Sequence, residues 1–516
     1  MTTIATPADE RIAQPQEPEA ATGVLQRALN YDLSRPLAFV ALAIAYIAGR
    51  VPFIDNGFGT KPDAWRIALT GYWLWDKHEF YPSRLPGYPV AELGYAAVIK
   101  GGWLATNSLT IAVSLLGLWF FARIVQKVGL PNPALIVVGF AFQPLLWINT
   151  MNTMDYAWAL TLILGCYYFL LSRQTSMAGI MIGLAIGSRL PSAAMLLPAV
   201  VYLWRDGKRG ELRDFVVWAV VIPMLAFLPI VWKYGPDFLG FYDAKVAYRT
   251  VIRLLAKDSL GLLGTLAVGI GVLVSLPRLA KLPGDAVRDK DVMFWTLAVV
   301  LYVIVFLRLP HEAAYLIPLF PFAFLLIGRY FRTAVLAGVI SVMLLANFVD
   351  LTTTNHEVAL SSFKELRLGQ GMLLSNRDTM NAQLSFVHDL EHRRVPDRSV
   401  VMIGFAYPQF AVLNRDRLQL DVLEKDKSSI SQLTDKGKAV DTAHQITYVW
   451  LLEYAPFERF LSQRYSIFYT LDAGRSTQAL YNYRPGLYNN PPAASVQPID
   501  IGRGPSGGRG TADTTR

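Results

Sequence analysis

Long apolar runs separated by short polar segments dominate residues 37–349. The first run, Leu37–Ile54, would extend about 27 Å as a helix, close to the hydrocarbon thickness of a bilayer. The pattern predicts a polytopic α-helical membrane protein with about eleven transmembrane helices. The predicted spans are Leu37–Ile54, Ser108–Ile124, Ala134–Ile148, Tyr156–Leu171, Met177–Ser188, Pro191–Trp204, Phe215–Trp232, Leu260–Leu276, Val292–Leu307, Ala314–Gly328 and Ala334–Val349.

The segment between the first two spans, residues 55–105, has a different pattern. It is too polar and too interrupted for further spans, and it mixes tryptophan and tyrosine with charged residues and proline. Aromatic residues among charges are typical of a membrane–water interface. We therefore expect surface-lying helices in this first outer loop, within a transmembrane domain that covers residues 37–349.

Composition agrees with a membrane protein. The chain is 53% hydrophobic and 17% charged, whereas soluble domains carry about 25% charged residues. The net charge of +9 is explained by lysine and arginine near lipid head groups, so no nucleic-acid partner is expected. Because Cys166 is the single cysteine, an internal disulfide is excluded. No P-loop or Gly-x-Ser-x-Gly motif is present, which leaves ATP-driven transport and serine-hydrolase chemistry without support.

Positive charges predict the orientation. Lysine and arginine clusters follow the second, fourth, sixth, eighth and tenth spans, and such clusters favour the cytoplasm. Residues 1–36, which lack a signal-peptide pattern, then form a cytoplasmic disordered tail at the plasma (inner) membrane. The outer loop 233–258 is also basic. Either the span count is off by one, or this loop has its own use for positive charge.

The pattern changes after the last span. In residues 350–485, strand-like runs (Ser399–Gly404, Ile446–Leu452, Ser466–Leu471) alternate with helix-like runs (Leu384–Arg393, Pro456–Arg464). This alternation predicts a small α/β domain, which an odd number of spans places in the periplasm or outside the cell. Residues 486–516 are rich in proline and glycine, so we expect a disordered tail.

Acids and cations collect on the predicted outer side. A carboxylate at a membrane surface can act as a general base, and arginines at the same level can bind a phosphate through paired donors. We therefore predict one site, with Asp55 as the catalytic base. The other candidates are Asp63 and Asp155 as acceptor-binding or second acids, and Arg189, His311, Glu312, Tyr315 and Arg253 as ligands of a donor phosphate.

Each candidate has a simpler alternative. Asp55 and Asp155 could cap the helices that follow them, and Arg189 could extend toward the interface. His311 and Glu312 could pair with each other or with Arg308, and the basic loop 233–258 could contact lipid head groups. Asp55, Asp155 and Glu312 could also hold Mg²⁺ or Mn²⁺, but no spacing specifies a metal site, so we favour a site without one.

Five motifs resemble one enzyme family. Ile54-Asp55-Asn56 resembles the first-loop aspartate of the GT-C glycosyltransferases. Four further segments resemble motifs of the protein-mannosyltransferase and aminoarabinose-transferase branch, in the same order, over about residues 37–330. They are Ser83-Arg-Leu-Pro-Gly-Tyr-Pro89, Pro144-Leu-Leu-Trp with Met154-Asp155, Gly183-Leu-Ala-Ile-Gly-Ser-Arg189, and His311-Glu-Ala-Ala-Tyr-Leu-Ile-Pro-Leu-Phe-Pro321.

The resemblance implies an inverting hexosyl- or pentosyltransferase. It would move a sugar from a polyprenyl-phosphate donor to a protein, lipid or glycan acceptor on the outer face. By position, Asp55 would be the general base, and Arg189, His311 and Tyr315 would bind the donor phosphate. In the last motif, a His-Glu pair stands upstream of the tyrosine where the branch has an arginine. The alternatives are a transporter or flippase of a lipid-linked saccharide, and a non-catalytic scaffold.

Overall fold

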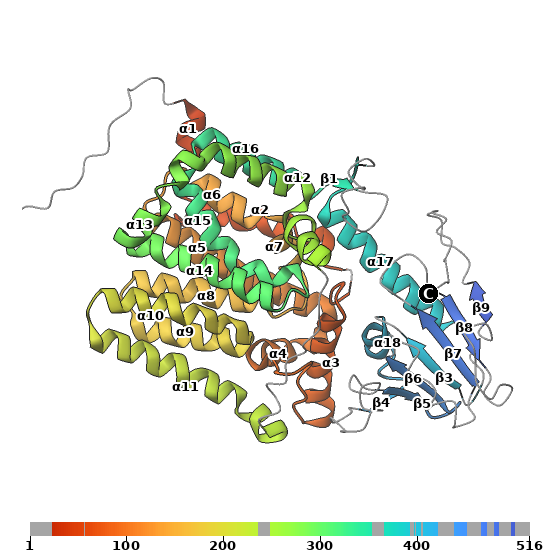
Figure 1. Ribbon diagram of the computed structural model, residues 1–516. Helices are drawn as coiled ribbons and strands as arrows, with labels where there is room; N and C mark the ends of the chain where they lie inside the picture. Colours follow the sequence, from red (N-terminus) through yellow and green to blue (C-terminus); the bar gives the residue numbers. More distant parts are fainter. Residues whose placement is uncertain are drawn as a thin grey trace, which may run out of the picture.

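The structure is a computed structural model of the chain. It describes residues 23–55, 57–235, 248–352, 366–392, 397, 399–403, 406–421, 438–450, 466–471, 479–483 and 497–500. Most of the described chain up to residue 345 is helical, and most of these helices run roughly side by side (Figure 1).

Six helical segments of the described chain are long and apolar enough to cross a bilayer. Each overlaps a predicted span, which supports a multi-pass helical membrane protein. The six segments are α2 with η1 (Pro36–Ala48 and Val51–Phe53), η2 with α5 (Ile99–Gly101 and Gly102–Val128), α11 (Arg209–Tyr234), α12 (Tyr248–Leu279), α14 (Lys290–Arg308), and η5 with α15 (Ala313–Leu319 and Phe320–Tyr330).

The remaining predicted spans fall on shorter apolar helices, so the total of eleven stays a prediction. The third span is divided where Pro144 begins a new helix. At this break, Arg50 is fully buried and donates to the Ala141 carbonyl over 2.9 Å and to Thr150 over 2.8 Å. The shorter helices are α6 (Pro133–Ala141), α7 (Pro144–Asn149), α8 (Tyr156–Leu171), α9 (Thr175–Ser188), η3 (Leu190–Met195), α10 (Leu196–Arg205) and α16 (Thr333–Leu345).

The outside of the helical body is apolar. Helix α11 leaves Met224 67% exposed and Trp232 89% exposed. It buries Phe215 and Ile230 against the neighbouring helices. A soluble protein rarely exposes such a continuous apolar surface, whereas lipid tails would cover it. The exposed side chains therefore support a bilayer around this part of the chain.

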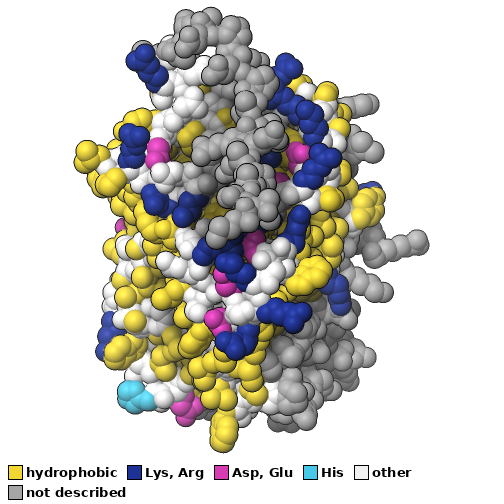
Figure 2. All heavy atoms as spheres, turned by 90° about the vertical axis from the view of Figure 1, so that its left-hand side faces the viewer, with side chains coloured by type: hydrophobic (Ala, Val, Ile, Leu, Met, Phe, Trp, Pro, Cys, Tyr) yellow, Lys and Arg dark blue, Asp and Glu magenta, His cyan; other side chains and the backbone are white. Residues whose placement is uncertain are grey.

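Positive charges gather at one end of the helical body. Figure 2 shows lysine and arginine side chains spread over this end, which includes the short helix α13 (Leu282–Arg288). Acidic residues connect some of these cations: Lys290 lies 3.0 Å from Asp206, and Arg329 lies 3.0 Å from Asp289. The clusters used for the positive-inside prediction therefore share one end, as that prediction requires.

At the opposite end, two helices from the segment between the first two predicted spans cross the ends of the bundle. Helix α3 (Pro62–Lys77) runs across the other helices in Figure 1, and α4 (Pro89–Ala96) packs against it. Trp65 of α3 and Tyr95 of α4 are both fully buried. That these two helices lie at a membrane surface, as the sequence predicts, stays a prediction.

Beyond this end lie α17 (Met372–Glu391), α18 (Tyr407–Leu413) and a sheet (Figure 1). The seven strands have the order β4-β5-β6-β3-β7-β8-β9. Central β3 pairs in parallel with β6 and β7, and the outer pairs are antiparallel. The strands are β3 (Ser399–Ile403), β4 (Gln419–Asp421), β5 (Lys438–Asp441), β6 (Ile446–Trp450), β7 (Ser466–Leu471), β8 (Ala479–Tyr483) and β9 (Gln497–Asp500).

The three predicted strand-like runs overlap β3, β6 and β7, and the first helix-like run, Leu384–Arg393, overlaps the end of α17. The second, Pro456–Arg464, lies outside the described residues. Strand β9 falls in the stretch 486–516, so the expected disorder does not hold for its four residues, which pair with β8. A two-stranded ribbon of β1 (Val349–Thr352) and β2 (Arg367–Gln370) lies between α16 and α17 in the chain.

The predicted disordered tail, residues 1–36, contains a helix. Residues Val24–Leu29 form helix α1. The Asn30 side-chain oxygen accepts a hydrogen bond from the backbone N–H of Asn132 over 3.1 Å. The Ser34 hydroxyl donates to the side-chain oxygen of Gln126 over 3.0 Å. The ordered chain therefore begins before the predicted boundary at residue 37, because these polar side chains connect it to the ends of α5 and α6.

Candidate functional site

The loop between α3 and α4 is held by a buried carboxylate. Glu92 is fully buried, and its two oxygens accept the backbone N–H groups of Ser83 (2.8 Å) and Tyr88 (3.2 Å). Burial raises the pKa of Glu92, although these hydrogen bonds act in the opposite direction. Gly87 has φ +91°, and a Cβ there would lie 2.3 Å from Ile230 Cδ1. These constraints fix the position of Arg84.

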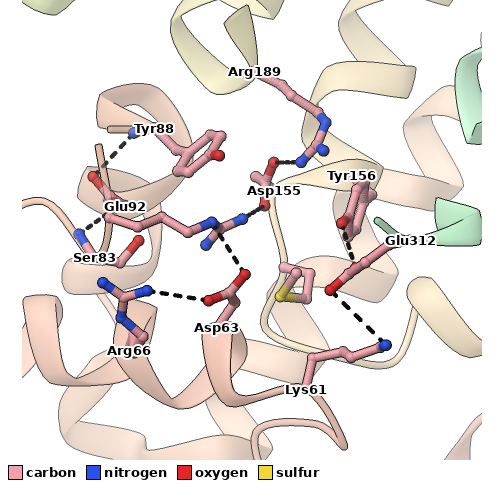
Figure 3. A network of polar contacts seen from close by, with 12 residues as sticks. Lys61, Asp63, Arg66, Ser83, Tyr88, Glu92, Asp155, Tyr156, Arg189 and Glu312 are labelled. Carbon is pink, nitrogen blue, oxygen red and sulfur yellow. Dashed lines mark hydrogen bonds and ion pairs between the residues drawn. The ribbon is translucent and has the colours of Figure 1, made fainter. Parts of the chain in front are cut away.

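Arg84 and Arg189 bind the same carboxylate from two different parts of the chain. Figure 3 shows the contact between Arg189 and Asp155. Arg84 Nη2 lies 3.1 Å from Asp155 Oδ1, and Arg189 Nη1 lies 2.5 Å from Asp155 Oδ2. Arg84 Nε also lies 3.1 Å from Asp63 Oδ2, and Asp63 Oδ1 is 3.4 Å from Arg66. The arginine network is defined here as Asp63, Arg66, Arg84, Asp155 and Arg189.

Arg189 is enclosed by aromatic rings. Its guanidinium carbon lies 4.2 Å from the ring centre of Tyr156 and 4.5 Å from that of Tyr315. Cation–π contacts of this kind hold a guanidinium in place and exclude water from it. The structure therefore brings Tyr315 and Arg189 together, as the sequence predicted. The side chain of Arg189 is 6% exposed, so it does not extend freely to an interface.

Asp155 precedes helix α8, but it does not cap it. It occupies the N-cap position without a side-chain hydrogen bond to the helix. Instead, both carboxylate oxygens are used by arginines, and the side chain is 0% exposed. The capping alternative for Asp155 is therefore wrong. A buried carboxylate between two guanidiniums serves to position them, because removing it would leave buried positive charge uncompensated.

Glu312 connects three elements beside the arginine network. It accepts a hydrogen bond from the Tyr156 hydroxyl over 2.8 Å and lies 3.8 Å from Lys61 Nζ. Glu312 precedes η5, Tyr156 opens α8, and Lys61 precedes α3. The predicted role of Glu312 in phosphate binding stays a prediction. Its observed contacts tie together the ends of the helices that surround Arg189.

One nitrogen of the Arg84 guanidinium is not used by the arginine network. Its Nη1 atom is buried and finds no hydrogen-bond partner in the described part of the chain. Burial alone would lower the pKa of Arg84, but the carboxylates of Asp63 and Asp155 act against it, and this pKa is held well above its ordinary value. A permanently charged guanidinium with a free buried N–H is a binding group for an anion.

Asp55 lies outside this network. Its side chain accepts a hydrogen bond from Trp103 Nε1 over 2.9 Å at the start of α5, and the residue is exposed. The contacts from Asp55 toward Asp155 run through the rings of Trp103 and Phe58 and then through the backbone of Thr153, which donates to the Phe58 carbonyl over 2.8 Å. Asp55 as the catalytic base stays a prediction, and Asp63 is the first-loop acid that lies among the arginines.

Two further candidates lie beside the network without joining it. Arg253 is on α12, where its Nε lies 3.3 Å from Asp258. Helix α12 packs against η5. His311 stands next to Glu312, and among the described residues its ring has no hydrogen-bond partner. Both residues therefore keep a predicted role that no observed contact with Arg84 or Arg189 supports.

The sequence-based candidate list omitted Arg84, Tyr88, Tyr156 and Lys61. Arg84 and Tyr88 belong to the motif Ser83–Pro89, so the resemblance of this motif to the enzyme family already pointed to them. The buried Glu92, nine residues after Ser83, gave a second signal. An acid in an apolar stretch usually binds backbone N–H groups or a cation.

The network is suited to an anion more than to a metal ion. The network with its neighbours Lys61 and Glu312 has four cations (Lys61, Arg66, Arg84 and Arg189) and three carboxylates (Asp63, Asp155 and Glu312). A hard metal ion needs several free oxygen ligands. Here the oxygens of Asp63 and Asp155 already face arginines. The residues present therefore do not fit a Mg²⁺ or Mn²⁺ site at this network.

Comparisons with known proteins return little. No protein-family model matches the sequence, and no sequence relative is found among characterised proteins. Among solved structures, the chain is similar to the crystal structure of ArnT from Cupriavidus metallidurans bound to undecaprenyl phosphate. The match has a TM-score of 0.41 and 16% sequence identity. It covers 60% of this chain, and the chain spans about three fifths of the length of that protein.

Proposed function

We propose that the chain is a membrane glycosyltransferase that uses a polyprenyl-phosphate-linked sugar. The observation that carries this proposal is the pair Arg84 and Arg189, which converge on Asp155 and leave Arg84 Nη1 as a buried donor without a partner. The pair lies at the end of the helical body opposite the lysine and arginine clusters. The positive-inside rule assigns the clusters to the cytoplasmic face, and therefore the pair to the outer face. The motifs quoted above support the same activity.

The donor phosphate would bind at Arg84 and Arg189. Guanidinium groups form charge-assisted hydrogen bonds with phosphate oxygens, and these strengthen in a site from which water is excluded. Tyr156 and Tyr315 hold Arg189 on both sides, while Asp63 and Asp155 orient Arg84. A polyprenyl chain would leave the site along the apolar outside of the helices, which a bilayer would surround.

We assign the base role to Asp63, because it lies in the network and its side chain is 25% exposed. An acceptor hydroxyl would give its proton to Asp63 while its oxygen forms a bond to the anomeric carbon of the sugar. The bond from that carbon to the phosphate oxygen breaks, and the polyprenyl phosphate leaves with the electron pair. The configuration inverts because attack and departure take place on opposite faces.

The Asp63–Arg84 pair would couple the two events. Protonation of Asp63 removes the negative charge that Arg84 now faces at 3.1 Å. Arg84 can then balance the charge that develops on the departing phosphate. The ion pair at rest would therefore be exchanged for one with the leaving group, at the moment when that group becomes most negative.

Purified chain in lipid nanodiscs tests this function. A panel of polyprenyl-phosphate sugars is supplied together with an extract of envelope lipids and glycans, and release of polyprenyl phosphate is followed by mass spectrometry. The wild-type chain should consume one member of the panel, and Arg189→Ala should not. Arg213→Ala is the matched control, since Arg213 is 78% exposed on α11 near the opposite end. Equal release by all three chains would contradict the proposal.

A second arm separates transfer from transport. In sealed vesicles, movement of a labelled lipid-linked saccharide across the bilayer without any glycosylated product would favour the transporter alternative. A product that forms without net movement of the donor would favour transfer.

A further inference from the structure

The last turn of α17 carries a cluster that the arginine network does not involve. His388, Glu391 and His392 each offer one ligand atom, and these atoms lie within 4.8 Å of one another. Residues three and four positions apart share one face of a helix. Two imidazoles and one carboxylate on one face are the donor set of many transition-metal sites. We propose that these three residues form a binding site for a divalent transition metal ion of the Zn²⁺ class.

His392 is held in the tautomer that metal binding requires. Its Nδ1 lies 2.8 Å from the His388 carbonyl oxygen. A carbonyl can only accept a hydrogen bond, so Nδ1 must carry the proton. Nε2 then keeps a free lone pair. A ligating histidine commonly donates its other ring N–H in this way, which fixes the ring orientation.

Glu391 is also oriented by a neighbour. Its Oε1 accepts a hydrogen bond from Asn414 Nδ2 over 2.6 Å, at the end of α18. Its other oxygen, Oε2, lies 3.9 Å from His388 Nδ1. One carboxylate oxygen is therefore anchored, and the other faces the first histidine. An ion bound here would join the end of α17 to the segment after α18.

The position favours a cation. Helix α17 ends at Glu391, and the carbonyl groups of a last helical turn carry partial negative charge. The ring centres of His388 and His392 lie 4.2 Å apart, so one ion can contact both imidazoles. The His388 side chain is 69% exposed, so an ion can enter from solvent.

Small side-chain rotations would complete the geometry. Zn–N and Zn–O bonds of about 2.0–2.1 Å in a tetrahedral site place ligand atoms about 3.3 Å apart. The donors now lie within 4.8 Å, and exposed histidines rotate at little cost. Three protein ligands would leave one position open for water. The donor set, two nitrogens and one oxygen, suits Zn²⁺, Ni²⁺ or Cu²⁺ better than Mg²⁺ or Ca²⁺.

Zinc titration of the full chain tests the site. The protein is prepared without a histidine tag, treated with a chelator and dialysed, and Zn²⁺ is then titrated in competition with a chromogenic chelator. The wild-type chain should bind one equivalent more tightly than His388→Asn or His392→Asn. We expect the affinity to fall by about tenfold or more, because loss of an outer-shell partner alone costs that much.

His444→Asn is the matched control. His444 is a 60% exposed histidine of the same part of the chain and lies 3.0 Å from Asp441, but it is not in the cluster. This variant should keep wild-type affinity. Gel filtration and circular dichroism check that each variant is folded.

A second readout keeps the test independent of variant stability. Co²⁺ added to the wild-type chain should give visible absorption bands of low-coordinate cobalt with nitrogen ligands, and Zn²⁺ should displace them. Equal zinc affinity in wild type and His388→Asn/His392→Asn, or the absence of such bands in wild type, would overturn the proposal. Neither readout depends on sugar transfer, so the proposed enzyme function can fail while this site stands.

Discussion

Arg84 Nη2 lies 3.1 Å from Asp155 Oδ1, although 71 residues separate them in the sequence. This contact joins the loop between α3 and α4 to the start of α8, and both arginines share the Asp155 carboxylate. Neither Arg84 nor Arg189 would form an anion-binding site alone, because an isolated arginine side chain is mobile and solvated. Their fixed arrangement around a buried carboxylate is what the proposed phosphate site depends on.

Replacement of Asp63 tests the assignment of the base. Asp63→Asn keeps the size of the side chain but cannot accept a proton, so transfer should fall by about 10²–10⁴-fold. Donor binding should be retained, because Arg84 and Arg189 remain and the lost Asp63 charge no longer competes with the phosphate for Arg84. Asp76→Asn on the exposed side of the same helix is the control. The measurement is the rate of polyprenyl phosphate release at saturating donor.

Asp55→Asn completes that experiment. Asp55 bonds to Trp103 away from the arginines, so this variant should keep most of its activity. If Asp55→Asn abolishes transfer and Asp63→Asn does not, the sequence-based assignment of Asp55 is right and the assignment of Asp63 fails.

Much of the fold followed from the sequence. Apolar runs located the membrane helices, since the bilayer imposes a length and a composition that few other structures need. The breaks within them were missed. Pro144 divides α6 from α7, and Arg50 supplies the hydrogen bonds that the break requires. Such breaks depend on partners that are distant in sequence, so a local pattern cannot predict them.

The site was predicted in part. Asp155, Arg189 and Tyr315 were grouped because their helices end on the same side, and the structure places them in contact. Asp55 was favoured over Asp63 because it ends an apolar run. The structure shows that Asp63 is the acid that contacts Arg84, while the choice of Asp55 as the base stays a prediction. The order of the spans predicts which helix ends lie together, whereas the contacts among the residues at that end depend on loop conformation.

Asp155→Asn should destabilise the protein strongly. The substitution leaves two guanidiniums in a buried place without their shared counter-charge, and loss of one partner of a buried pair costs about 3–5 kcal/mol. Thermal unfolding in nanodiscs measures the effect. Asp214→Asn is the control, because Asp214 is 47% exposed beside Arg213 and such pairs contribute about 0–1 kcal/mol. Equal melting temperatures for the two variants would show that Asp155 does not hold the site together.

Glu92 should impose a pH dependence on stability. Burial raises the pKa of Glu92, so the folded state binds its proton more tightly than the unfolded state does. Its contribution to stability is then greatest below the ordinary glutamate pKa of about 4.3 and declines as pH rises through the raised value. The melting temperature of wild type minus that of Glu92→Gln should fall over this window. A difference that rises with pH would contradict the direction of the shift.

Direct binding of polyprenyl phosphate tests the central claim that Arg84 and Arg189 form a phosphate site. Native mass spectrometry compares polyprenyl phosphate with polyprenol, which lacks the phosphate, on the wild-type, Arg84→Ala and Arg213→Ala chains. We expect the wild-type chain to prefer the phosphate and Arg213→Ala to match it. Arg84→Ala should bind about 10- to 100-fold more weakly, as loss of hydrogen bonds to a charged group predicts. Equal binding of phosphate and alcohol, or an unchanged affinity in Arg84→Ala, would contradict the account.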